Sequence, residues 1–116
     1  MWRTAGWLCL PALVVACGAG FPTGKTVFDE NCAVCHGTGG LGDGPFADKF
    51  LSVPPDLTVL TRNNGGEFPT LYVTNIIEGH GRGDHFSGAM PEFAVTLEGK
   101  AFRIEPLVDY IESLQK

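Results

Sequence analysis

The spacing of apolar and polar residues along this 116-residue chain predicts short helices and no strands. Apolar residues recur every three or four positions over 25–35, 69–78 and 101–114, as they do on one face of a helix. A single helical turn is expected within 46–51. No segment shows the sustained alternation of a half-buried strand. The pattern predicts an all-α domain of about four short helices.

Residues that begin and end helices stand at the edges of these segments. Thr23 or Gly24 begins the first helix, and Gly37 lies just beyond its end. Gly79 is the expected stop of the second long segment. Pro106 is tolerable only in the first turns of the last helix. Between the helices, 37–55 and 79–91 are rich in glycine and are expected to be loops, and loops of this length are uncommon unless functional.

The first residues have the pattern of a secretory signal peptide, predicted over 1–16. A short basic start precedes an apolar stretch that is too short to span a membrane. Cleavage before Cys17 would match a bacterial lipobox, and the Cys17 thiol would then carry lipid. Cleavage after Ala19 would instead release a protein without lipid. The third possibility is a membrane anchor that is not cleaved. The favoured division is a flexible tether at 17–23 and a domain at 24–116, exported to the periplasm, with Cys17 as a membrane tether.

Composition and charge exclude some classes of protein and of function. The chain has 44% hydrophobic and 18% charged residues, which fits a globular class rather than a disordered one. It has 8 Lys and Arg against 13 Asp and Glu, a net charge of −5, which becomes −6 without residues 1–16. This balance excludes the basic face that nucleic-acid binding needs.

The motif that indicates chemistry is Cys32-Ala33-Val34-Cys35-His36, the C-x-x-C-H pattern of haem attachment. At positions i, i+3 and i+4, the two sulfurs and the imidazole leave one side of a helix. The thiols of Cys32 and Cys35 can add to the two vinyl groups of a haem, and His36 then lies under the iron. The pattern predicts one covalently bound haem c.

Three further roles for the two cysteines compete with haem attachment. A thioredoxin-like pair would follow a strand, but a helical segment precedes Cys32. A structural zinc site needs four ligands and the chain has no second cysteine pair within the domain. A plain disulfide leaves His36 and both glycine-rich loops without a role.

With this motif the chain resembles the class I cytochromes c, small electron carriers with a single haem, over 24–114. Gly24 and Phe28 stand where that family has a small residue and an aromatic before the haem motif. Leu107 and Tyr110 match the apolar and aromatic pair of its last helix. The resemblance implies the cytochrome c fold, with these two helices crossing, and an electron-transfer protein rather than an enzyme.

The resemblance also implies a sixth iron ligand and its surroundings. A methionine in a glycine-containing loop is expected, and Met90 in Gly88-Ala89-Met90-Pro91 fits; His80 and His85 are the alternative ligands, and Met90 could instead only fill the core. A proline carbonyl is expected to accept from His36; Pro45 is the choice, with Pro54 and Pro55 in reserve. Apart from the resemblance, anionic haem propionates need donors or cations, and the candidates are Arg62, Tyr72 and Arg82; the alternative is that each is an ordinary surface or core residue.

The predicted function is one-electron transfer with no acid, base or nucleophile. The negative charge implies redox partners that present a neutral or basic patch. Two alternatives stay open: a haem subunit of a larger dehydrogenase or oxidase, and a gas sensor or peroxidase with a labile sixth ligand.

Overall fold

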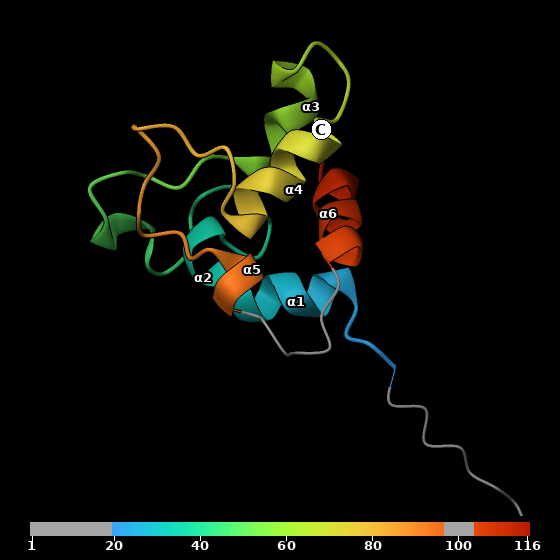
Figure 1. The fold of residues 1–116 in the computed structure, drawn as a ribbon, viewed down its shortest axis with the longest axis horizontal. Helices are drawn as coiled ribbons and strands as arrows, with labels where there is room; N and C mark the ends of the chain where they lie inside the picture. Colours follow the sequence, from blue (N-terminus) through green and yellow to red (C-terminus); the bar gives the residue numbers. More distant parts are fainter. Residues whose placement is uncertain (1–19, 97–103) are drawn as a thin grey trace, which may run out of the picture.

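The computed structural model describes residues 20–96 and 104–116, which form helices and loops without a strand (Figure 1). The prediction of an all-α domain is confirmed. In chain order the elements are α1 (Gly24–Asn31), α2 (Ala33–His36), the 3₁₀ helices η1 (Ala47–Lys49) and η2 (Leu57–Val59), α3 (Leu60–Asn63), α4 (Thr70–Glu78), α5 (Phe93–Thr96) and α6 (Ile104–Ser113).

Some of the predicted features lie outside the described residues. The signal peptide at 1–16, Cys17 and the possible cleavage after Ala19 all lie there, as does the expected start of the last helix at 101–103. Within the described residues no helix is long and apolar enough to cross a membrane.

The helix count and one helix boundary differ from the prediction. The expected helix at 25–35 is divided at Cys32, whose φ of −113° leaves the regular helical range and ends α1. The helices α3 and α5 were not predicted, because each has four residues and shows no apolar repeat. The turn expected within 46–51 is confirmed as η1.

The ends of α1 and α4 follow the predicted chemistry. The side-chain oxygen of Thr23 accepts a hydrogen bond from the Thr26 backbone N–H at 3.2 Å, which caps α1. Gly79 ends α4 with a φ of 104°, a left-handed conformation that suits glycine, and its N–H bonds to the Asn75 carbonyl.

The core centres on the contact between α1 and α6, which meet near the start of α1 (Figure 1). Phe28 is fully buried and Leu107 is 1% exposed. The rings of Phe28 and Tyr110 lie edge to face with centroids 5.3 Å apart. The helix crossing expected from Gly24, Phe28, Leu107 and Tyr110 is therefore confirmed, and it fixes the helix that leads into Cys32.

Candidate functional site

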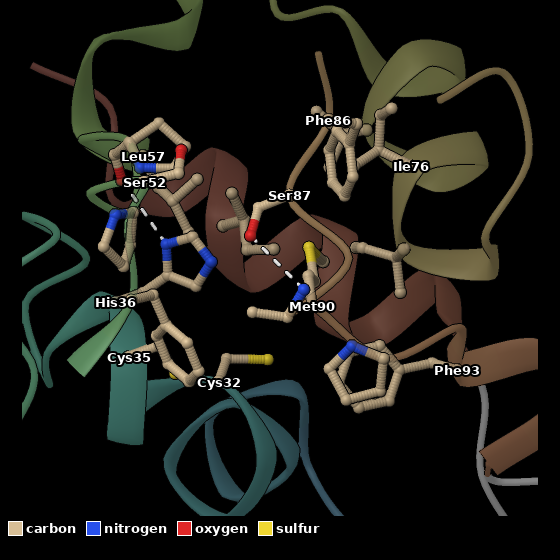
Figure 2. A pocket seen from close by; sticks show the side chains of 18 of the residues that line it. Cys32, Cys35, His36, Ser52, Leu57, Ile76, Phe86, Ser87, Met90 and Phe93 are labelled. Atoms are coloured by element: carbon tan, nitrogen blue, oxygen red, sulfur yellow. Dashed lines mark hydrogen bonds between the residues drawn. The ribbon is translucent and has the colours of Figure 1, made fainter. Parts of the chain in front are cut away.

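A cavity of about 460 Å³ lies beside this core, in the size range of small-molecule and cofactor sites. Its walls come from the end of α1, from α2, η2, α3, α4, α5 and α6, and from both glycine-rich loops. Most of the lining is apolar and includes Leu57, Leu60, Val73, Ile76, Ile77 and Phe93. Cys32, Cys35, His36 and Met90 line the same cavity (Figure 2).

The turn at the start of α2 places the cysteine and histidine side chains on this cavity. The N–H groups of Cys35 and His36 both bond to the Cys32 carbonyl, at 3.2 and 2.9 Å. These bonds close a helical turn across the C-x-x-C-H segment, so the i, i+3 and i+4 positions share one side. The geometry expected from the spacing is present although α1 ends before it.

The imidazole of His36 is oriented by the backbone. Its Nδ1 lies 3.3 Å from the carbonyl oxygen of Pro55. A carbonyl only accepts, so Nδ1 carries the proton and donates, which leaves Nε2 as the unprotonated nitrogen. Burial lowers the pKa of His36, although the bond to Pro55 opposes that shift. The neutral ring is the form that ligates a metal.

The choice of Pro45 as the partner of His36 is wrong, and the loop geometry shows why. The segment after α2 folds back on it, because Gly42 N–H bonds to the His36 carbonyl at 2.8 Å and Gly44 N–H to the Cys35 carbonyl at 3.1 Å. Pro45 is thereby exposed. The chain then returns past Gly42, where an added Cβ would meet the Pro54 and Pro55 carbonyls. The reserve candidate Pro55 is the residue that reaches the imidazole.

The thiol of Cys32 lies in an environment that disfavours its reactive, ionised form. Cys32 is buried, and this burial, followed by the nearby Cys35, raises the pKa of its thiol to about 12. A thiol acts as a redox nucleophile through its thiolate, which this environment disfavours. The buried environment of Cys32 therefore gives no support to a thioredoxin-like role.

Met90 lies on the loop between α4 and α5 and is half-buried. In Figure 2 its sulfur and the His36 ring come from opposite sides of the cavity, with Cys32 between them at one edge. His85 also lines the cavity but is exposed, whereas His80 does not line it and lies 3.9 Å from Glu78.

The three residues expected near the propionates have different positions. Tyr72 lines the cavity. Arg62 is exposed on α3, and neither it nor Arg82 is among the lining residues. The guanidinium of Arg82 instead donates to the carbonyl oxygens of Ile76, Met90 and Pro91. The sequence carried no signal for this arrangement, because it depends on how the loop folds.

Comparison with known proteins decides the family. The model of the family described as Cytochrome c matches residues 22–115, most of the chain. The chain belongs to the cytochrome c family. No curated protein and no solved structure matches it.

The residues of this cytochrome fit the covalent haem c that its family binds. The cavity is apolar, as a porphyrin requires, and a thiol pair stands at its edge beside a neutral, oriented imidazole. Among the described residues, no group of three or more His, Cys, Asp or Glu side chains could hold a metal ion by itself. The family uses its haem for electron transfer and is generally not enzymatic.

Proposed function

We propose that this cytochrome is an exported one-electron carrier in which His36 and Met90 are the two axial ligands of the haem iron. The observation that carries the proposal is that one apolar cavity is lined by Cys32, Cys35, His36 and Met90, with His36 and Met90 on opposite sides (Figure 2). When bound, haem c supplies reversible one-electron chemistry at its iron.

Different residues attach the haem, orient its histidine ligand and set its reduction potential. Cys32 and Cys35 hold it through two thioethers, and the Pro55 carbonyl keeps the His36 ring in one orientation. The Met90 thioether favours ferrous iron more than a second histidine would, which raises the reduction potential. No side chain is needed as an acid, base or nucleophile.

The test of axial ligation uses the holoprotein matured in a bacterial periplasm. The ferric wild type should show the Met-to-iron charge-transfer band, and its ferrous form should not bind CO at neutral pH. Met90→Ala should lose the band and bind CO, whereas His85→Ala should keep the band. A wild type that lacks the band and whose ferrous form binds CO would favour the gas-sensor or peroxidase alternative, and a wild type that lacks the band without binding CO would favour His80 or His85 as the ligand.

Export and lipid attachment are part of the proposal and rest on the sequence pattern at 1–17. Mass spectrometry of the mature protein reports the cleavage site, acyl chains on Cys17 and covalent haem together. A measured mass that corresponds to a chain starting at Gly20, without acyl chains, would reject the prediction of a lipoprotein. Co-purification with a dehydrogenase or oxidase would favour the alternative of a complex subunit.

The proposed redox partners present a neutral or basic patch, because the chain without residues 1–16 carries a formal charge of −6. The rate of electron transfer with a basic redox protein should fall as salt is added, since salt screens the attraction. A rate that does not fall would reject this docking.

A further inference from the structure

Arg82 makes an unusual set of hydrogen bonds for a residue at the start of a loop. Its Nε and Nη2 donate to the Ile76 carbonyl oxygen at 3.1 and 2.8 Å. Its Nη1 donates to the Met90 carbonyl at 2.7 Å, and Nη2 also donates to the Pro91 carbonyl at 2.7 Å. One guanidinium thus joins the last part of α4 to the backbone of Met90 and Pro91.

The carbonyl of Ile76 is available because of how α4 ends. The N–H of His80, four residues later, bonds to the Asn75 carbonyl at 2.7 Å. The last carbonyls of a helix need partners from outside it, and a cation is favoured there by the helix dipole. Arg82 meets both needs, and its planar fork lets it bind several oxygens at fixed angles.

The loop at 79–91 has few other hydrogen bonds that hold Met90 to the body of the protein. Phe86 N–H bonds to the Gly83 carbonyl at 2.9 Å, and Met90 N–H to the Ser87 carbonyl at 3.4 Å. Ala89 N–H bonds to the Ser87 hydroxyl at 3.2 Å. These three bonds lie inside the loop. The N–H groups of Gly79 and His80 tie the start of the loop to the Asn75 carbonyl of α4, and the Met90 side chain packs against the core. At the other end of the loop, the backbone of Met90 and Pro91 is joined to α4 through the hydrogen bonds of Arg82.

Phe86 contacts the Arg82 guanidinium and also lines the cavity. The Arg82 guanidinium lies 4.6 Å from the centroid of the Phe86 ring, a distance at which the cation and the ring attract each other. Phe86 also lines the cavity, next to Ile76 (Figure 2). The same side chain of Arg82 therefore orders the backbone of Met90 and an apolar part of the cavity wall.

We propose that Arg82 is the positioning residue for the axial ligand Met90: its bonds to Ile76, Met90 and Pro91 hold the thioether over the iron. The inference rests on the proposed His36 and Met90 ligation. It concerns how firmly the loop holds Met90, so its effect is measured by how easily imidazole displaces Met90 from the iron. The apparent affinity of such a ligand rises with the fraction of molecules in which Met90 is released.

The experiment measures imidazole binding to the ferric holoprotein. Arg82→Gln removes the charge and most of the donors, and should raise the affinity for imidazole about tenfold or more, since hydrogen bonds from charged donors are strong. Arg82→Lys keeps the charge but not the planar fork, and should also raise the affinity severalfold and weaken the Met-to-iron band. Lys25→Gln removes an exposed charge on α1 and should change neither.

The outcomes separate this inference from the proposed function. If the wild type lacks the Met-to-iron band, Met90 ligation fails and the inference fails with it. If the band is present and both Arg82 variants bind imidazole as the wild type does, only the inference is overturned. If Arg82→Lys binds imidazole as the wild type does and only Arg82→Gln binds it more tightly, the inference is also overturned. The charge of Arg82, and not its placement of the Met90 backbone, would then control imidazole binding. If Arg82→Gln does not mature, Phe86→Leu is the second variant. Phe86→Leu should raise the affinity for imidazole, but by less than Arg82→Lys does. Wild-type imidazole affinity in both Phe86→Leu and Arg82→Lys would reject the proposal.

Discussion

Gly24 faces the carbonyl oxygen of Pro106 so closely that a Cβ on Gly24 would overlap it. The same added atom would lie 3.0 Å from the Cβ of Tyr110. The crossing of α1 and α6 thus needs glycine for its lack of a side chain. The crossing also sets the direction in which α1 delivers Cys32 to the cavity.

We expect Gly24→Ala to destabilise the holoprotein by about 1–3 kcal/mol or more, because the helices must move apart to admit the methyl group. Thermal or denaturant unfolding of the haem-containing protein measures the change. Gly39→Ala is the matched control, since its added Cβ would meet only the Leu41 side chain, at 3.9 Å and beyond. Equal stability of the two variants would contradict the tight crossing.

The features that follow from short-range spacing could be predicted from the sequence. The C-x-x-C-H segment places its side chains together through one helical turn, which depends on neighbours three and four residues apart. The stop of α4 at Gly79 likewise follows from the local preference of glycine for positive φ. The crossing at Gly24 is a longer-range feature, and it came from the family resemblance rather than from periodicity.

The features that depend on the paths of the loops could not be predicted. In sequence Pro45 is the preferred carbonyl partner because it is nearer to His36, but the return of the chain beside Gly42 brings Pro55 to the imidazole instead. Arg82 has the charge expected of a propionate contact, but its partners are backbone carbonyl oxygens. Contacts to the backbone cannot be predicted from the pattern of side chains along the sequence. The four-residue helices α3 and α5 are too short for a period to be visible.

The carboxylate of Asp56 should make stability depend on acid pH. The hydroxyl and backbone N–H of Thr58 donate to it at 2.6 and 2.8 Å, and these bonds lower the pKa of Asp56 below its ordinary value of 3.8. A lowered folded pKa means that the stabilisation is complete above 3.8 and is lost as the pH falls through the folded value.

The advantage of the wild type over Asp56→Asn in the free energy of unfolding should therefore shrink as the solution is acidified below that pH. Denaturant midpoints at a series of pH values measure the difference. Thr58→Val removes the hydroxyl donor and should reduce the pH dependence in part, because the backbone N–H remains. A difference that stays constant from neutral to acid pH would contradict this role of Asp56.

The polypeptide without haem should be largely unfolded. The cavity is about 460 Å³, and at about 24 cal/mol per Å³ an empty space of that size would cost at most on the order of 10 kcal/mol. That cost is comparable to the whole stability of a small domain. The double variant Cys32→Ser, Cys35→Ser, prepared without haem, should give a poorly dispersed NMR spectrum, whereas a well-dispersed spectrum would contradict the prediction.

The side chain of Gln115 joins the end of α6 to the elements on one side of the cavity. Its Nε2 donates to the carbonyl oxygens of Leu57 and Ile111 at 2.6 and 2.9 Å. Its Oε1 accepts from the Thr61 N–H at 2.9 Å, and that N–H lies in the first turn of α3, where no helical partner is available. Leu57 lines the cavity, so this side chain also steadies part of the wall.

We expect Gln115→Ala to lower the free energy of unfolding of the holoprotein by about 1–3 kcal/mol, because it leaves partly buried backbone groups without partners. The melting temperature should fall by roughly 4–8 °C per kcal/mol for a domain of this size. Glu112→Ala is the control on α6: its side chain is exposed and forms no hydrogen bond among the described residues, so its melting temperature should match the wild type. If the two alanine variants melt together, the three bonds of Gln115 contribute nothing net, and α3 must be held in place by the apolar contacts of Leu57 and Leu60 with the core.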